Sequence, residues 1–311
     1  MTRSCIVAFI LFGVATQFLN ARMDAENVNS NRGSGTLLVL RVRSQVVSGD
    51  PEQAGLSRPE EQVIEIDPAK SAIVTVDVWN GHSSTEHTRR IDSIVPRLNE
   101  AVEAARNLGM VIIHGPSIGA LKQNARELYP GERLKHNIYT RAPQRKATLA
   151  LRDFPLPELD ESWKEHGEMP FAEHERVVDG TWVTETSPKW RMHPELVLGE
   201  DDYIVDNLQE LWNVCQTHGI GNLIYCGFAS NMCLVSKPWG IGGGKSLGIN
   251  CYFIRDLVTP LTPMDENLSV RTDRPLETAD FVHEEVVRHI ETYLAPSLDS
   301  RQLIDSAGHF R

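Results

Sequence analysis

The feature that most constrains the fold of this 311-residue chain is a short apolar segment at residues 71–78, rich in β-branched side chains. Such a run, broken by Asn80-Gly81, is typical of a strand that is buried on both faces of a parallel sheet. Apolar residues then recur at helical spacing over 91–108, and a second apolar run follows at 110–114. Strand, helix and strand in this order predict a parallel βαβ unit.

The same alternation returns in the second half of the chain. It predicts strands at 202–205, 222–226 and 250–254 and helices at 208–218, after Asn231 and at 276–294. The sequence therefore predicts an α/β fold, a three-layer α/β/α arrangement with a predominantly parallel sheet whose ligands bind at the carboxyl ends of the strands. Residues 115–200 lack long periodic runs, as is usual for a functional loop or lid.

Composition predicts how the two ends of the chain behave. Arg3, an apolar run at 5–15 and small residues after it indicate a secretory signal peptide, so we expect an exported protein, periplasmic or extracellular. The expected parts are a signal peptide (1–21), an N-terminal extension with a β-like run at 36–47 (22–66), the main α/β domain (67–296) and a loose C-terminal tail (297–311).

Net charge and cysteine content limit the kinds of partner and the kind of fold that we expect. Asp and Glu outnumber Lys and Arg by 42 to 31, a net charge of −11, which argues against nucleic acid as a partner. After signal removal no segment is apolar enough to span a membrane. The four remaining cysteines are too few and too clustered for a disulfide scaffold, so a packed core must stabilise the fold. We expect a small-molecule substrate.

Three separated motifs carry chemistry: Val74-Thr-Val-Asp77, Trp190-Arg-Met-His-Pro-Glu195-Leu, and the stretch from Ile224 to Val235 that contains Gly-Phe-Ala-Ser-Asn-Met-Cys233. In this order they resemble the isochorismatase-like hydrolases, also called the cysteine hydrolase superfamily. The resemblance covers about residues 68–295 and implies that family's α/β fold and an assembly of identical subunits.

The resemblance implies a site in which Cys233 attacks an amide or related acyl carbon and Asp77 takes its proton. It also implies an oxyanion hole built by the turn residues Phe228, Ala229, Asn231 and Met232, with a cis peptide bond between Phe228 and Ala229. Elementary chemistry agrees with the pairing, because a thiol with a pKa of ~8.5 is mostly protonated at neutral pH and needs a nearby base.

One position departs from the family. The resemblance aligns Asp206 with the family's catalytic lysine, and if Asp206 faced Asp77, one of the two carboxylates would hold its proton more tightly. The chain also resembles an exported branch with this aspartate, through Asp77-x-Trp79-x-x-His82 and Cys233-x4-Pro-Trp239-Gly-Ile. The candidate pocket residues, several of them cations that could compensate, are Trp79, His82, His114, Arg191 and Lys237, with Lys189, His193, Trp190 and Trp239 as further candidates.

We expect no cofactor. A zinc site would need Asp77, His82 and His114 to converge, and Gly240-Ile-Gly-Gly-Gly-Lys-Ser246 lacks the first glycine of a phosphate loop, so we read its glycines as leaving room near the site entrance. The leading hypothesis is cysteine-dependent hydrolysis of a C–N bond in a small amide or ureido-type substrate. A binding or regulatory protein on the same scaffold and cysteine-independent ether hydrolysis, as in isochorismatase, stay open as alternatives.

Overall fold

The computed structural model describes residues 36–49, 57–80, 85–117, 142–170, 192–262 and 279–309. The predicted signal peptide and parts of the predicted loop region lie outside these ranges. Within them, no helix is both long enough and apolar enough to cross a membrane.

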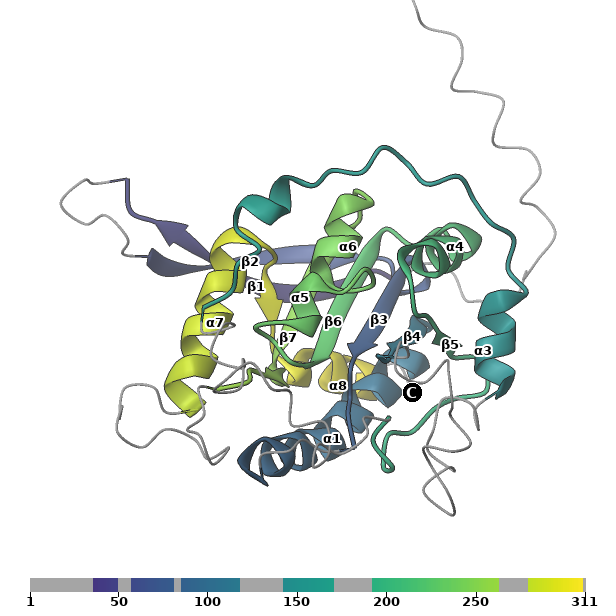
Figure 1. Ribbon diagram of the computed structural model, residues 1–311, viewed down its shortest axis with the longest axis horizontal. Coiled ribbons are helices and arrows are strands. Elements are labelled where there is room, and N and C mark those ends of the chain that lie inside the picture. The colour runs from purple at the N-terminus through teal and green to yellow at the C-terminus, as the bar shows by residue number, and fades with distance from the viewer. Residues whose placement is uncertain are drawn as a thin grey trace, which may run out of the picture. The chain divides into compact units, whose positions relative to one another are not determined.

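An eight-stranded sheet forms the centre of the described structure, in the order β2-β1-β8-β7-β6-β3-β4-β5 (Figure 1). The strands are β1 (Leu38–Val47), β2 (Ser57–Ile66), β3 (Ser71–Val76), β4 (Val111–Gly115), β5 (Tyr203–Ile204), β6 (Asn222–Phe228), β7 (Asn250–Thr259) and β8 (Ser297–Leu298). From β8 to β5 all neighbours run parallel, and only β1 pairs antiparallel, with β2 and with β8. The predicted predominantly parallel sheet is confirmed.

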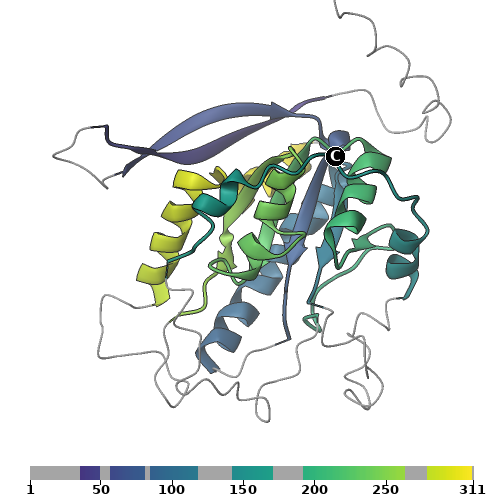
Figure 2. The ribbon, with the colours of Figure 1, turned by 45° about the horizontal axis from the view of Figure 1, so that its top comes forward.

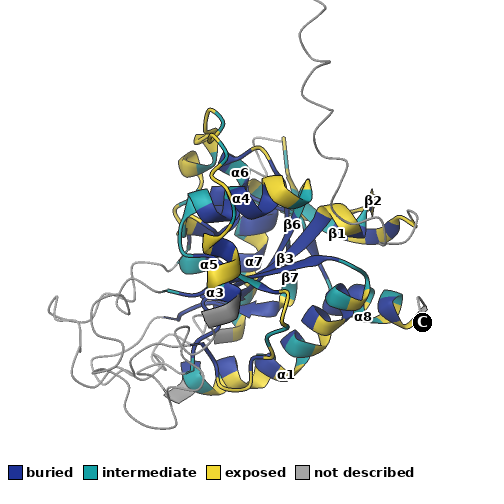
Figure 3. Ribbon diagram, turned by 90° about the vertical axis from the view of Figure 1, so that its right-hand side faces the viewer, coloured by how far each residue is buried: buried dark blue, intermediate teal, exposed yellow. Residues whose placement is uncertain are grey.

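Helices cover both faces of this sheet, which gives the predicted three layers (Figures 2 and 3). One face packs against α1 (Thr85–Asn107) and α8 (Ser300–His309). The other packs against α4 (Leu208–His218), α5 (Cys233–Ser236), α6 (Ile241–Ser246) and α7 (Ala279–Tyr293). The remaining elements are α3 (Ala142–Leu149), which contacts β5, and two 3-10 turns, η2 (Pro68–Lys70) and η5 (Ser162–Glu165).

Local sequence explains why the central elements form where they do. Every residue of β3 and of β4 is buried, as the continuous apolar runs predict for strands that are covered on both faces. Helix α4 begins after Asn207, whose side chain accepts a hydrogen bond from Glu210 N (2.8 Å), and it ends at Gly219 with a φ of 63°. The sequence predicted both of its ends correctly.

The segments predicted as an N-terminal extension and a C-terminal tail both pack into the folded unit. The β-like run expected at 36–47 forms β1, and β1 and β2 belong to the main sheet. Leu298 of β8 and Leu303 of α8 are fully buried, so the region 297–309 is part of the core and not a loose tail. The segment is short, and its role becomes visible only through its long-range packing against α1 and β1.

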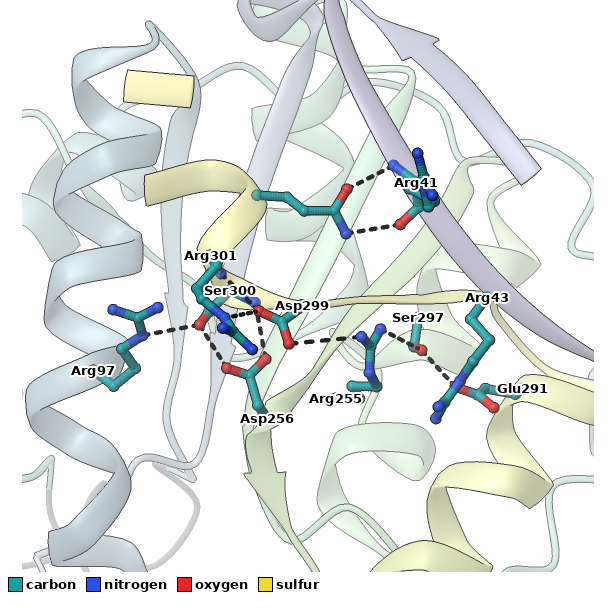
Figure 4. A network of polar contacts seen from close by, with 11 residues as sticks. Arg41, Arg43, Arg97, Arg255, Asp256, Glu291, Ser297, Asp299, Ser300 and Arg301 are labelled. Carbon is teal, nitrogen blue, oxygen red and sulfur yellow. Dashed lines mark hydrogen bonds and ion pairs between the residues drawn. The ribbon is translucent and has the colours of Figure 1, made fainter. Parts of the chain in front are cut away.

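Polar side chains connect the β1–β2 hairpin and the β8–α8 segment to the rest of the fold (Figure 4). Arg43 of β1 binds the buried Glu291 of α7 (2.8 Å). At the start of α8, Ser300 donates to Asp256 of β7 (2.5 Å) and accepts from Arg97 of α1 (3.0 Å). Segments from both ends of the chain are thereby joined to the central strands.

Candidate active site

Asp77 follows directly after β3, at the carboxyl edge of the sheet. Its backbone has a φ of 44°, a left-handed conformation that Asp and Asn adopt more readily than most residues. Its N–H donates to Gly115 O (3.0 Å), and Ser117 Oγ donates to its Oδ2 (2.7 Å). The side chain is only 1% exposed, and Oδ1 accepts no hydrogen bond of good geometry from the described residues. The site thus contains a buried carboxylate with unused acceptor capacity.

Cys233 begins α5, after the turn that ends the neighbouring strand β6. In this turn Gly227 has a φ of 112°, and a Cβ there would lie 2.0 Å from Val76 O of β3. Only glycine therefore allows the ends of β6 and β3 to approach this closely. The peptide bond between Phe228 and Ala229 is cis, as the family resemblance implied. These features bring Cys233 to Asp77.

The thiol and the carboxyl group influence each other's ionisation. Burial raises the pKa of Asp77, and Cys233, the positive charge of Lys237 and the bonds from Ser117 partly offset this effect. Burial and then the adjacent Asp77 raise the pKa of the Cys233 thiol, while Lys237 and the Ala229 N–H lower it. With its pKa raised, the resting thiol is protonated at neutral pH.

Some backbone N–H groups of the turn are hydrogen-bonded within it and others are not. The N–H groups of Met232 and Leu234 both donate to Ala229 O (3.0 Å each). The N–H groups of Asn231 and Cys233 make no hydrogen bond within the described residues. The Asn231 side chain is not available to a ligand, because it donates to Leu261 O (2.8 Å) and accepts from Leu261 N (2.9 Å). Asn231 can therefore contribute to an oxyanion hole only through its backbone.

Asp206, in the place of the family's lysine, has its own counter-ion. Its carboxylate pairs with Arg145 Nη2 of α3 (3.0 Å) and accepts from Asn207 Nδ2 (2.7 Å), and Arg145 also binds Glu210. Burial, rather than an opposing Asp206 charge, is the largest cause of the raised Asp77 pKa. Arg145 was missed by sequence reasoning because it lies in the irregular region between motifs, and no local pattern marks it.

His114 does not line the catalytic pair, contrary to prediction. It is fully buried in β4, where Nδ1 hydrogen-bonds with Thr75 Oγ1 (2.8 Å) and Nε2 with Asp202 Oδ2 (2.9 Å). Asp202 also pairs with Arg106 Nη2 of α1 (2.9 Å). Its pKa falls to about 2, because the bonds and charges of His114 and Arg106 outweigh the opposing effect of burial.

The set of residues that a zinc site would need, Asp77, His82 and His114, does not fit this arrangement. Both ring nitrogens of His114 are engaged, so it cannot ligate a metal beside Asp77 without breaking its bonds to Thr75 and Asp202. His82, the third candidate, lies outside the described residues. In the described ranges no group of three or more His, Cys, Asp or Glu side chains is arranged to bind a metal.

Of the predicted pocket residues, Lys237 lowers the pKa of both Asp77 and Cys233 through its positive charge. Trp79, two residues after Asp77, is buried and forms a β-bridge with Met192, and His193 N donates to Val78 O (2.8 Å). These contacts hold the segment around His193 against the chain that follows β3. His193 also binds Asp92 of α1 (3.1 Å). The candidates Lys189, Trp190 and Arg191 lie outside the described residues.

The glycine-rich segment after Cys233 was interpreted incorrectly. It forms helix α6 instead of leaving open space at the site entrance. A Cβ at Gly243 would lie 1.9 Å from Pro238 O, and one at Gly244 would lie 2.4 Å from the Tyr225 hydroxyl. These glycines let α6 pack closely against α5 and β6.

A parallel three-layer α/β protein with a cysteine after one central strand and a buried carboxylate after the next has the architecture of a cysteine-hydrolase-type enzyme. The model of the isochorismatase domain matches residues 71–280, so the chain belongs to the isochorismatase family, a family of hydrolases.

Solved structures show similarity at low sequence identity. A cysteine hydrolase from Pseudomonas syringae pv. phaseolicola 1448A is 15% identical, with a TM-score of 0.44 over 79% of this chain and 96% of that one. An isochorismatase from Pseudomonas putida KT2440 is 14% identical, with a TM-score of 0.44 over 76% and 91%. N-carbamoylsarcosine amidase from Thermoplasma acidophilum is 13% identical, with a TM-score of 0.33 over 74% and 96%. No curated protein sequence matches the chain.

Proposed function

We propose that this protein hydrolyses a C–N bond in a small amide or ureido-type substrate, with Cys233 as nucleophile and Asp77 as proton carrier. The observation that carries the proposal is the placement of the buried Asp77 and of Cys233 after the carboxyl ends of two neighbouring parallel strands, β3 and β6, where each group shifts the pKa of the other. A carboxylate with an unused lone pair beside a protonated thiol is the arrangement that general-base activation requires.

The reaction proceeds in two halves. Asp77 accepts the thiol proton as Cys233 Sγ forms a bond to the carbonyl carbon. The tetrahedral adduct collapses when the C–N bond breaks and Asp77 gives that proton to the leaving nitrogen, which leaves a thioester. Asp77 then takes a proton from water, whose oxygen attacks the thioester carbon, and returns it to the departing sulfur. The net change is amide plus water to carboxylic acid plus amine.

The developing negative charge on the substrate oxygen needs donors that are already in place. The N–H groups of Asn231 and Cys233, which have no acceptor within the described structure, meet this requirement. The Ser117 hydroxyl has a different role, because its bond to Oδ2 fixes the Asp77 carboxyl group and leaves Oδ1 for the proton.

The first experiment is a screen of small amides and ureido compounds with the wild-type protein, followed through amine or ammonia release and intact-mass detection of an acyl adduct. Cys233→Ala is expected to lower turnover by at least about 10³-fold and to abolish the adduct. Cys215→Ala, which alters a fully buried cysteine of α4, is the matched control and is expected to keep the activity.

The outcomes separate the alternatives. Full turnover by Cys233→Ala would replace this proposal with aspartate-dependent ether hydrolysis. A wild-type protein that turns over no substrate, forms no adduct and shows ordinary thiol reactivity would indicate a binding protein on the same scaffold. Export directed by residues 1–21 and assembly into a homo-oligomer remain predictions from the sequence.

A further inference from the structure

Lys237 follows Cys233 by one helical turn. Its backbone N–H donates to Cys233 O (3.2 Å), so the two residues lie on the same side of α5. The side chain is half-buried, and its Nζ lies 5.5 Å from the centroid of the Trp239 ring, within the range of a cation–π interaction. The ammonium group is therefore held by an aromatic face.

Trp239 is itself fixed relative to Asp77. Its Nε1 donates to Gly115 O (2.8 Å), and the same carbonyl oxygen accepts the Asp77 N–H (3.0 Å). The indole is 5% exposed and packs so tightly that a Cβ at Gly115 would lie 2.1 Å from its Cδ1. One carbonyl group thus aligns the carboxylate and the ring that holds the ammonium.

The carboxylates near the site pair with arginines, so the charge of Lys237 acts on Asp77 and Cys233. Within the described ranges no carboxylate forms an ion pair with Lys237, whereas Asp206 pairs with Arg145 and Asp202 pairs with Arg106. The charged groups there that act on Cys233 are Asp77 from the end of β3 and Lys237 from its own turn, and the Ala229 N–H is the neutral donor.

We propose that Lys237, held over the Trp239 ring, is the positioning residue whose positive charge stabilises the Cys233 thiolate during the reaction. The inference rests on the proposed function, since it names the cation of that same site. A buried thiol and carboxyl share one negative charge while the proton moves between them. An ammonium near both groups favours the charged form of each, so it makes ionisation of the sulfur easier.

The test measures thiolate formation directly and does not depend on a substrate. The ultraviolet absorbance of the thiolate is titrated against pH for each protein, and the titration of the same protein carrying Cys233→Ser is subtracted to isolate Cys233. Lys237→Met is expected to raise the midpoint by about one pH unit and to slow alkylation of Cys233 about tenfold at a fixed pH below the midpoint. Lys237→Arg is expected to keep the wild-type midpoint, because it keeps the charge. Lys245→Met, on α6, is the matched control and is expected to change neither measurement.

Trp239→Phe tests whether the position of the Lys237 ammonium matters in addition to its charge. It keeps an aromatic face but removes the Nε1 bond to Gly115, and its midpoint is expected to fall between those of wild type and Lys237→Met. A midpoint that is the same in wild type, Lys237→Met and Lys237→Arg would overturn the inference, and it would leave the hydrolase proposal standing if amide turnover persists. An unreactive wild-type thiol together with absent turnover would instead remove both.

Discussion

Asp77, the proposed proton carrier, shows at the scale of one residue how a functional group can oppose stability. Its carboxylate is buried with one oxygen bound by Ser117 and the other without a well-formed bond. Burial raises its pKa above the ordinary value of 3.8, so the charged form is less favourable in the folded chain than in the unfolded chain. Stability is therefore lost as pH rises from the unfolded pKa through the folded one.

Asp77→Asn is expected to abolish most activity and yet raise the thermal midpoint at pH 7. Asn keeps an oxygen for Ser117 and tolerates the φ of 44°, but it carries no charge and accepts no proton. The activity loss should be about 10²–10⁴-fold. The stability gain should shrink as pH falls from the raised folded pKa, and it should vanish below about 4, where the wild-type carboxyl is protonated in both states.

Thermal melts of both proteins across pH check the sign of this effect. A variant that melts below the wild type at pH 7 would show that contacts to the Asp77 carboxylate outweigh its burial. Asp202→Asn provides the opposite case, because its folded pKa of about 2 lies below 3.8. Its charge stabilises the fold above that unfolded value, and the contribution disappears as pH falls through about 2.

At the scale of elements, the contact between β6 and β3 decides where Cys233, the proposed nucleophile, lies. The two strands are in register from Ser71 with Asn222 to Val76 with Gly227. At the last pair the glycine leaves regular strand geometry, and the chain then enters the turn that carries Cys233. A side chain at this pair would push apart the two strand ends that hold the nucleophile and the carboxylate.

Gly227→Ala is expected to destabilise the fold by at least about 3 kcal/mol, because it combines a backbone clash with a φ of 112° that L-residues rarely adopt. Urea unfolding followed by circular dichroism measures the change in the free energy of unfolding. Gly221→Ala, before β6, is the matched control, because a Cβ there meets nothing within 4 Å. It should stay within about 0.5 kcal/mol of wild type. Equal stabilities for the two variants would contradict the close approach.

At the scale of the whole molecule, the described fold extends beyond the βαβ units that the sequence displays. The hairpin of β1 and β2 and the segment of β8 and α8 adjoin each other, with β1 paired to β8 and Arg41 bonded to Gln302 through backbone N–H (2.6 Å) and C=O (2.8 Å). Residues from both ends of the domain thereby complete one core around Leu298 and Leu303.

A chain that ends after Pro296 is expected to lose much of its stability, because removing β8 and α8 exposes the apolar surfaces of α1, β1 and β7 that they cover. Leu303→Ala is the milder test and should cost about 2–5 kcal/mol. Arg301→Ala changes an exposed side chain of the same helix and serves as control. Thermal melts and soluble yield give the answer, and a shortened chain that melts like the full one would show that this segment is dispensable.

The sequence by itself determined the parallel α/β core and placed Cys233 and Asp77 at strand ends. Continuous apolar runs and helical spacing are local patterns, and the order of three motifs is readable along the chain. The limits of α4 followed from the same local information, whereas the position of the cis bond was implied by the resemblance to the family.

Only the tertiary structure decided which partners the polar groups take. His114 binds Asp202 and Thr75, Asp206 binds Arg145, and Lys237 lies over Trp239, each across a separation or a turn that no local pattern encodes. The same holds for the two ends of the chain, which periodicity alone assigned to an extension and a tail. A side chain's charge partner and a strand's neighbour depend on packing between distant segments, and that packing exists only once the chain has folded.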